Sequence, residues 1–201
     1  MSARWGVRRR CAVLGSPIEH SLSPALHAAA YASLGLNWSY ERVEVDHKQL
    51  VPFVNSLDAS WRGLSLTMPL KEVVLELGEV DELARLAGAG NTLILEKGTR
   101  RVFNTDVGGL TWAVHNVTAA PVPRVTILGA GATARAALIA AAQLGALRAG
   151  CVVAGLRLHP EASAYDHELQ AVAPDLVVCE SDRLGELRER TPTGTRFVVA
   201  D

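Results

Sequence analysis

A glycine-containing turn in the C-terminal half restricts the fold of this chain more than any other feature of its sequence. The turn joins an apolar run at 124–128 to an alanine-rich run at 132–144, which predicts a strand, a tight turn and then a helix. Its residues are Gly129, Ala130, Gly131, Ala132, Thr133 and Ala134. Similar patterns predict strands at 151–154, 176–178 and 196–200 and a helix at 165–172. Repeated strand–helix units of this kind imply a parallel sheet with right-handed crossovers.

The N-terminal half has a different pattern of predicted elements, in which strands alternate with shorter helices and a hairpin. Ser23 is the predicted N-cap of a helix that has Pro24 at its first position, continues to Leu34 and ends at Gly35. Pro69 is predicted to restart a helix. The other predicted elements are strands at 10–15, 38–45 and 63–68, a helix at 49–57, and a hairpin at 91–95 and 101–103 around the turn 97–99.

Together these patterns predict an α/β protein with two lobes. We expect residues 1–112 to form a mixed α/β domain and residues 113–201 to form a Rossmann-like dinucleotide-binding domain. The boundary is placed just before the segment 115–123, which is rich in small residues and proline.

Composition limits the classes of partner that this chain is built to bind. Apolar residues make up 49% of the 201 residues and charged residues 20%, which is ordinary for a soluble globular protein. A formal net charge of -1 gives no long-range attraction to nucleic acid or to an anionic membrane. We therefore expect a small-molecule ligand, no nucleic acid and no membrane.

The cysteines and the N-terminus favour a cytoplasmic location. Cys11, Cys151 and Cys179 are too few and too scattered for a disulfide framework or a metal cluster, so we expect reduced thiols and no metal. The basic N-terminus leads directly into an apolar strand, without the pattern of an export signal. No apolar run reaches the roughly 20 residues that a membrane span requires.

The turn at 129–134 has the pattern of a dinucleotide site. Gly129 allows a tight turn, Gly131 lets the backbone approach a pyrophosphate, and Ala134 permits close packing of helix on sheet. The N-terminus of the following helix favours a negative charge. The alternative is an ordinary strand–helix turn without a ligand.

The end of the next strand bears on which dinucleotide would bind. An NAD site usually has an acidic residue there, about 20 residues after the turn, and this sequence has none. Arg157 follows instead and could pair with a 2′-phosphate, which favours NADP and leaves NAD as the alternative. In the other interpretation, Arg157 is a solvated loop charge.

Polar residues of the first lobe suggest a second site. Lys71 falls in the first turn of the helix predicted after Pro69, where a cation opposes the helix dipole at a cost of about 0.3–1 kcal/mol. A hairpin turn centred between residues 98 and 99 would place Asn91 opposite Asp106, where an amide and a carboxylate could grip adjacent hydroxyls. Alternatively, Lys71 is a surface lysine, and Asn91, Asn104 and Asp106 only cap strands and turns.

Five segments in sequence order resemble the shikimate dehydrogenase family, and the likeness extends from Val13 to Asp201. The segments are Ser21-Leu22-Ser23-Pro24, Thr67-Met68-Pro69-Leu70-Lys71, Ala89-Gly90-Asn91-Thr92, Asn104-Thr105-Asp106-Val107-Gly108-Gly109 and the nucleotide loop Gly129 to Arg135. The resemblance implies an N-terminal substrate-binding domain and a C-terminal NADP-binding domain. It also implies the NADP-dependent, reversible reduction of 3-dehydroshikimate to shikimate in aromatic amino-acid (chorismate) biosynthesis, by a monomer or a homodimer.

The resemblance also assigns roles to individual residues of the first lobe. In the family, Ser21 and Ser23 would bind the substrate carboxylate, Thr67 would help to place the ring, and Asn91 would contact its hydroxyls. Lys71 and Asp106 would form the catalytic pair, with Lys71 relaying the proton and Asp106 orienting Lys71 and the substrate. The nicotinamide carries the hydride.

Three departures from the family pattern keep other functions open. Ser65 stands where the family usually has asparagine, and the loop 155–159 lacks the usual Asn-Arg-Thr or Asn-Arg-Ser signature. The chain also stops at Asp201, whereas relatives continue into a tail that supplies a substrate-binding glutamine, so the second domain is expected to be incomplete. The alternatives are a quinate or aminoshikimate dehydrogenase and a truncated, non-catalytic ligand-binding relative.

Overall fold

The structure is a computed structural model that describes residues 8–117, 124–128, 131–143, 152–156, 169, 176–179, 184–191 and 193–199. The chain divides into two compact units, Met1–Thr105 and Asp106–Asp201. The boundary expected between residues 112 and 113 falls inside helix α4 (Asp106–Val117), which is continuous across it. Helix α4 is therefore grouped with the second unit, and the break in contacts comes before it.

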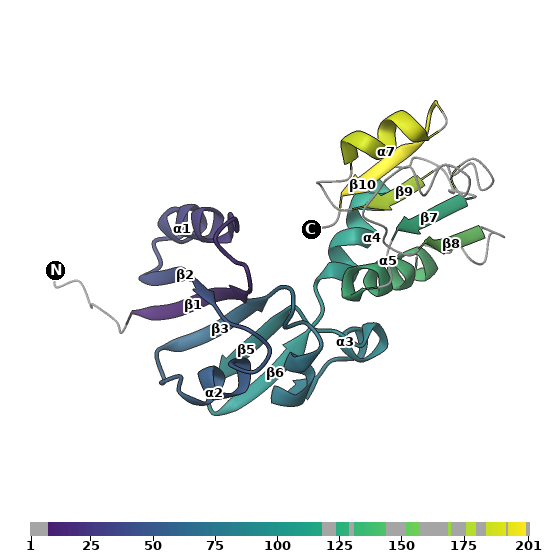
Figure 1. The fold of residues 1–201 in the computed structure, drawn as a ribbon. Helices are drawn as coiled ribbons and strands as arrows, with labels where there is room; N and C mark the ends of the chain where they lie inside the picture. Colours follow the sequence, from purple (N-terminus) through teal and green to yellow (C-terminus); the bar gives the residue numbers. More distant parts are fainter. Residues whose placement is uncertain are drawn as a thin grey trace. The chain divides into compact units, whose positions relative to one another are not determined.

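The first unit contains a mixed six-stranded sheet in the order β2-β1-β3-β5-β6-β4 (Figure 1). Strand β1 is parallel to β2 and β3, β5 is antiparallel to both of its neighbours, and β4 is parallel to β6. The strands are β1 (Arg9–Gly15), β2 (Trp38–Glu44), β3 (Trp61–Leu66), β4 (Glu79–Val80), β5 (Thr92–Glu96) and β6 (Thr99–Phe103). The predicted strands and hairpin are confirmed, with shifts of up to two residues, while β4 was not predicted.

Helices cover both faces of this sheet. The helical segments are α1 (Ser23–Ser33), α2 (Leu50–Asn55), the 3₁₀ helix η1 (Val73–Leu77) and α3 (Glu82–Ala87). Helix α1 connects β1 to β2, and α2 connects β2 to β3. Because β2 and β3 lie on opposite sides of β1, right-handed crossovers place α1 and α2 on opposite faces, as Figure 1 shows.

The apolar core lies on the α2 side of the sheet. Leu50 and Val54 of α2 are buried, and they belong to the same cluster as Leu14 of β1, Leu64 of β3 and Leu93 of β5. Each fully buried leucine contributes about 1.5–3 kcal/mol relative to an exposed one. The central strands are therefore held in place mainly by this one layer of side chains.

Helix α1 is attached to the sheet differently, because none of its residues is buried. Its His27 ring stacks on Tyr40 of β2, with ring centroids 3.9 Å apart and planes inclined by 10°. Tyr31 of the same helix lies against Trp38 of β2, with centroids 5.6 Å apart. Aromatic contacts with the edge strand β2 thus take the place of an aliphatic core on this face.

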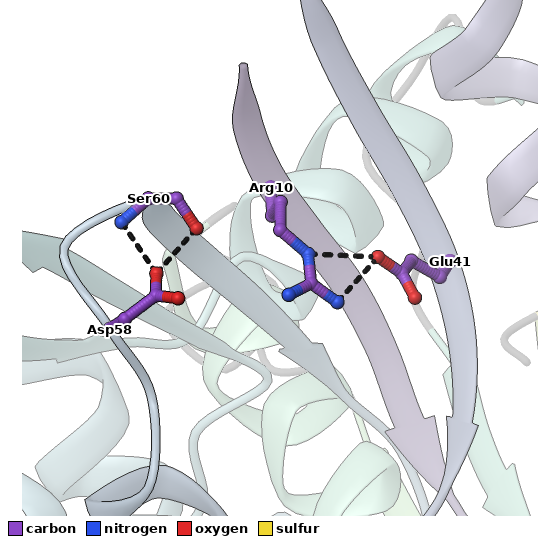
Figure 2. A network of polar contacts seen from close by, with 4 residues as sticks. All are labelled: Arg10, Glu41, Asp58 and Ser60. Atoms are coloured by element: carbon purple, nitrogen blue, oxygen red, sulfur yellow. Dashed lines mark hydrogen bonds and ion pairs between the residues drawn. The ribbon is translucent and has the colours of Figure 1, made fainter. Parts of the chain in front are cut away.

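Two pairs of polar residues, Arg10–Glu41 and Asp58–Ser60, lie near the amino end of β1 (Figure 2). Arg10 Nε and Nη2 donate to Glu41 Oε1 at 3.1 and 3.0 Å, and the guanidinium lies 4.3 Å from the Trp61 ring centroid. The hydroxyl and backbone N–H of Ser60 both donate to Asp58 Oδ1, and these bonds hold the pKa of the Asp58 carboxyl below its usual value. The Arg10 and Glu41 side chains are 39% and 40% exposed, so their ion pair contributes little to stability.

The second unit contains a four-stranded sheet in the order β10-β9-β7-β8, and every strand pair is parallel. Its elements are β7 (Arg124–Leu128), α5 (Ala132–Gln143), β8 (Val152–Leu156), β9 (Leu176–Cys179), α7 (Leu184–Arg190) and β10 (Arg196–Val199). The predicted parallel sheet and the helix after the turn are confirmed. The predicted helix at 165–172 lies outside the described residues except for Leu169, which is helical. Of the helices that the structure describes, none has the length and apolar character needed to cross a bilayer.

The helices predicted at 23–34 and 49–57 are confirmed as α1 and α2, but the predicted cap of α1 and the helix predicted at Pro69 are wrong. Ser23 does not cap α1, because the helix begins at Ser23 and the residue before it, Leu22, makes no side-chain capping bond. No helix begins at Pro69 either, since residues 68–72 form turns and the 3₁₀ helix η1 starts only at Val73. The carbonyl of Lys71 accepts a hydrogen bond from Gly90 N instead of an intrahelical donor, which keeps this segment out of a regular helix.

Sequence signals for α3 were present but were not used. Asp81 caps this helix, since its side chain accepts a hydrogen bond from Ala84 N at 2.9 Å. Gly88 ends the helix in the left-handed region, with φ 59°. An aspartate before the helix and a glycine after it are the usual capping signals, so this element could have been predicted.

Gly90 provides a test of how tightly the segment before β5 packs. A Cβ atom at this position would lie 2.3 Å from Val102 Cγ1 and 3.1 Å from Val74 Cγ1. Both valines are fully buried and cannot move aside. We expect Gly90→Ala to lower the free energy of unfolding by about 1–3 kcal/mol, measured by urea denaturation.

Gly108→Ala is the matched control. A Cβ at this helical position of α4 would meet nothing within 4 Å. We expect this variant to be neutral or to gain about 0.5–1 kcal/mol, because alanine favours helix more than glycine does. Equal denaturation midpoints for Gly90→Ala and the unmodified chain would contradict the close packing described above.

Candidate functional site

Strand direction brings the polar loops of the first unit to one edge of its sheet, meaning here the edge formed by the ends of the strands and not the outer strands β2 and β4. Strands β1 and β3 are parallel, so their carboxyl ends share an edge. Strand β5 is antiparallel to β3 and therefore begins at this edge, and β6, antiparallel to β5, ends there. The residues predicted as a site in this unit lie on the loops at this edge or at the start of a following helix: Ser21, Ser23, Thr67, Lys71 and Asn91.

The loops after β1 and β3 are joined through their backbones. Thr67 N donates to the carbonyl of Leu14 at 2.9 Å, and Ser16 N donates to the carbonyl of Met68 at 3.1 Å. Gly15 is required where these two loops approach each other, because a Cβ there would lie 2.5 Å from Thr67 Cγ2. Thr67 is thereby fixed beside the end of β1.

Lys71 and Asn91 are also linked by backbone hydrogen bonds. Gly90 N donates to the carbonyl of Lys71 at 2.7 Å, and Leu66 N donates to the carbonyl of Asn91 at 2.8 Å. The turn that carries Lys71 is therefore held directly against the start of β5. Both side chains are half-buried at this edge.

The register of the β5–β6 hairpin differs from the predicted one. Thr92 faces Phe103 and Glu96 faces Thr99, so the turn is centred between Lys97 and Gly98 rather than one residue later. Lys97 and Gly98 have φ of 50° and 82°, as a two-residue hairpin turn requires. The predicted cross-strand pairing of Asn91 with Asp106 is therefore wrong.

Asn91 instead binds the residue before Asp106. Its Nδ2 donates to Thr105 Oγ1 at 2.9 Å, and Thr105 N donates to Asn91 Oδ1 at 3.0 Å. Asn104 is buried and has a structural role, since its Nδ2 donates to the carbonyl of Ala89 at 2.9 Å. The segment 104–105 is thus tied to the segment 89–91, and Asp106 follows it directly as the first residue of α4.

The two serines lie where the loop after β1 enters α1. Ser23 N donates to Ser21 Oγ at 3.4 Å, and both residues are half-buried. Arg42 Nε of strand β2 donates to the carbonyl of Ser21 at 2.8 Å. The N-terminus of an eleven-residue helix carries a positive dipole end, so hydroxyl groups there are suited to an anion.

Tyr40 is a polar residue of this region that the sequence interpretation missed. Its hydroxyl donates to Ser65 Oγ at 2.7 Å. Ser65 is the residue that stands where the family usually has asparagine. Burial raises the pKa of the Tyr40 hydroxyl, so it stays protonated and acts as a donor at neutral pH. The period-two pattern of β2 places Tyr40 on one face with Arg42 and Glu44, but it does not show which loops that face meets.

The predicted dinucleotide turn lies in the second unit and is described only in part. Gly129, Ala130 and Arg157 fall outside the described residues. Gly131 has open space around the position of a Cβ, and α5 begins immediately after it with Ala132, Thr133 and Ala134. Strand order reverses at β7, since β8 lies on one side of it and β9 on the other. Ligands of parallel α/β sheets bind beyond the strand ends at such a point.

The predicted catalytic pair is divided between the units, with Lys71 in the first and Asp106 at the start of the second. Within the part of the chain that the structure describes, no group of three or more His, Cys, Asp or Glu side chains could hold a metal ion. The polar atoms gathered at the sheet edge are hydroxyls, amides and an ammonium group. Such a set can bind a small polyhydroxylated anion and exchange a proton with it.

Comparison with known proteins identifies relatives of this chain. Residues 13–93 match the family model of the shikimate dehydrogenase substrate binding domain. The NADP(+) shikimate dehydrogenase of Methanothermobacter thermautotrophicus is 42% identical over 136 residues, which are 67% of this chain and 48% of that protein. The enzyme of the same name from Thermus thermophilus is 40% identical over 140 residues, or 68% of this chain and 52% of that protein. The chain thus spans about half the length of the curated relatives it matches.

Solved structures give a longer match. Shikimate 5-dehydrogenase from Thermus thermophilus in complex with shikimate has a TM-score of 0.71 and 34% identity, and the match covers 88% of this chain and 70% of that one. The same enzyme in complex with NADP(H) and shikimate has a TM-score of 0.69 and 32% identity, with coverage of 85% and 67%. This chain therefore belongs to the shikimate dehydrogenase family.

Proposed function

We propose that this chain catalyses the NADP-dependent, reversible reduction of 3-dehydroshikimate to shikimate in aromatic amino-acid biosynthesis. The observation that carries the proposal is the convergence of Ser21, Ser23, Thr67, Lys71 and Asn91 on one edge of the first sheet. The names of its relatives, shikimate dehydrogenase (NADP(+)), support it. The activity is proposed for this chain itself, although the chain spans only part of their length.

The substrate carboxylate is assigned to Ser21 and Ser23. Both hydroxyls stand at the N-terminus of α1, where the helix dipole favours an anion by about 0.3–1 kcal/mol. Two hydroxyl donors can each bind one carboxylate oxygen. This end of the site fixes the orientation of the ring relative to Lys71.

The ring hydroxyls are assigned to Asn91, Thr67 and Asp106. The Asn91 amide is held by both the backbone N–H and the hydroxyl of Thr105, so its orientation is set before substrate binds. A preorganised amide discriminates among hydroxylated rings, because an analogue that lacks the matching hydroxyl leaves it unpaired. Asp106, next in sequence after Thr105, would accept a hydrogen bond from a neighbouring hydroxyl.

Lys71 is assigned the proton transfer, and Asp106 would orient it. In the direction of reduction, the Lys71 ammonium group protonates the carbonyl oxygen as the ring carbon gains hydride, and the reverse reaction returns that proton to the amine. When bound, the nicotinamide supplies or accepts the hydride at that carbon. The backbone bond between Lys71 and Gly90 holds the segment that carries Lys71 on the same edge as the hydroxyl-binding residues.

The dinucleotide is assigned to the turn 129–134 in the second unit. The open backbone at Gly131, the helix that follows it and the switch of strand order at β7 fit a pyrophosphate. Arg157 would pair with the 2′-phosphate of NADP. We also propose a cytoplasmic location, on the evidence of the scattered cysteines alone.

A related ring acid, quinate or an aminated shikimate, is the second candidate substrate. The observation that favours it is the contact between Ser65 and Tyr40, because Ser65 stands where the family usually has an asparagine. A site altered at this residue would accept a different ring substituent. Comparing kcat/KM for shikimate and quinate distinguishes the two.

Lys71→Ala is expected to reduce kcat for shikimate oxidation by about 10²–10⁴-fold, because the proton transfer is lost. The dissociation constant for shikimate should change much less, since the serines and Asn91 remain. The rate is followed by nicotinamide absorbance, and binding is followed by calorimetry. The matched control is Lys48→Ala, at an exposed lysine in the loop before α2, which should behave as the unmodified chain does. A normal kcat with a raised KM in Lys71→Ala would assign Lys71 to binding instead.

Arg157→Asp is expected to reverse the cofactor preference. Replacing the guanidinium with a carboxylate repels the 2′-phosphate and can accept a hydrogen bond from a ribose 2′-hydroxyl, so kcat/KM should fall for NADP and rise for NAD. The change in the ratio should be at least about tenfold, corresponding to about 1.4 kcal/mol. An unchanged ratio would leave Arg157 as a solvated loop charge.

A further inference from the structure

Two alternate residues of β2, Arg42 and Glu44, hold the loop that carries the two serines. Tyr40, Arg42 and Glu44 project from the same face of this edge strand, because side chains alternate between faces. Tyr40 bonds Ser65, and Arg42 bonds the carbonyl of Ser21. Glu44 Oε1 accepts a hydrogen bond from the hydroxyl of Ser16 at 3.0 Å. This face of β2 therefore reaches the loop between β1 and α1 at both of its ends.

Arg42 differs from the other two because it brings a permanent positive charge to the serines. Its Nε donates to the carbonyl of Ser21 at 2.8 Å, and its side chain is exposed. An arginine has five N–H donors in a planar fork, so a guanidinium bound through Nε can also present its terminal Nη groups to an anion. The bond fixes the guanidinium at the backbone of Ser21, two residues before Ser23.

The proposed carboxylate ligands are themselves uncharged. Ser21 and Ser23 offer hydroxyl donors, which bind a carboxylate and a neutral ester carbonyl by the same type of bond. A nearby guanidinium separates the two, because an ion pair between opposite full charges forms only with the anion. The neighbouring Glu44 and Glu19 are acidic and exposed, so they oppose an anion and cannot supply this discrimination.

We propose that Arg42 determines the preference of this site for a carboxylate-bearing ring. It positions Ser21 through the backbone carbonyl and places a cation beside the carboxylate of the substrate. The inference rests on the proposed function, because it assumes that Ser21 and Ser23 form the carboxylate end of the site. It goes beyond that function by naming the residue that selects an acid over its neutral ester.

The test compares shikimate with methyl shikimate in the full chain and in Arg42→Gln. We expect Arg42→Gln to raise the dissociation constant and KM for shikimate about tenfold, with a smaller effect on kcat, because uniform binding is lost. Values for methyl shikimate should change by less than about twofold. The preference for acid over ester should fall accordingly, and rising salt should weaken shikimate binding less in the variant than in the unmodified chain.

Arg42→Lys separates charge from loop geometry. It keeps the cation but lacks the planar fork, so part of the preference for acid over ester should return. Arg62→Gln is the matched control, because Arg62 donates to the carbonyl of Trp61 away from this loop, and it should leave both ligands unaffected. An equal loss of acid and ester binding in Arg42→Gln would mean that Arg42 only supports the loop, and no change for either would mean that it has no role. Both results overturn the proposal.

The same experiment keeps the two proposals distinct. Shikimate binding by the unmodified chain without NADP reduction would count against the proposed activity, while calorimetry would still decide the role of Arg42. Absence of shikimate binding by the unmodified chain would overturn both.

Discussion

Strand β5 runs antiparallel to β3, and this reversal sets where the polar loops of the first unit meet. Had β5 been parallel, Asn91 would start at the opposite edge, away from Thr67 and Lys71. The direction is held by packing, since Leu64 of β3 faces Leu93 of β5 and both are buried in the main core. The same leucines that stabilise the sheet therefore assemble the proposed site.

Backbone and side-chain hydrogen bonds then fix the positions of the loops that meet at this edge. The bond from Gly90 to Lys71 keeps the lysine out of a helix, and the bonds between Asn91 and Thr105 orient the Asn91 amide. Residues that hold this arrangement need not touch substrate. Gly15 and Gly90 admit the close approach of neighbouring segments, because a side chain at either would collide with them.

The sequence was sufficient to predict most strands, because buried strands are short apolar runs bounded by turn residues. It misplaced the hairpin by one residue, since Lys97 rather than Thr99 joins Gly98 at the centre of the turn, and a lysine with positive φ is an uncommon choice. That single shift removes the predicted pairing of Asn91 with Asp106, and the side chain of Asn91 bonds Thr105 instead. Helix α4 was missed because the motif 104–109 was interpreted for its chemistry, although Asp106 is also a favourable first residue for a helix.

The motifs of the proposed site could be found from the sequence, but their supporting residues could not. Ser21, Thr67, Lys71 and Asn91 were identified by the order of their motifs. Tyr40 and Arg42 contact residues distant in sequence, namely Ser65 of β3 and Ser21 of the loop after β1. Which loops β2 meets depends on its place at the edge of the sheet, next to β1, and no local pattern specifies strand order.

Amide chemical-shift mapping tests most directly whether one edge of the six-stranded sheet binds shikimate. Shikimate added to the isotopically labelled chain should shift the backbone amides of the four loops at this edge: 21–23, 67–71, 89–91 and 104–106. Amides near Arg9 and Arg10, at the other end of β1, should stay unchanged. Two results would contradict binding at this edge. One is that the shifts are confined to other parts of the chain. The other is that no amide shifts at shikimate concentrations well above the dissociation constants typical of metabolite sites.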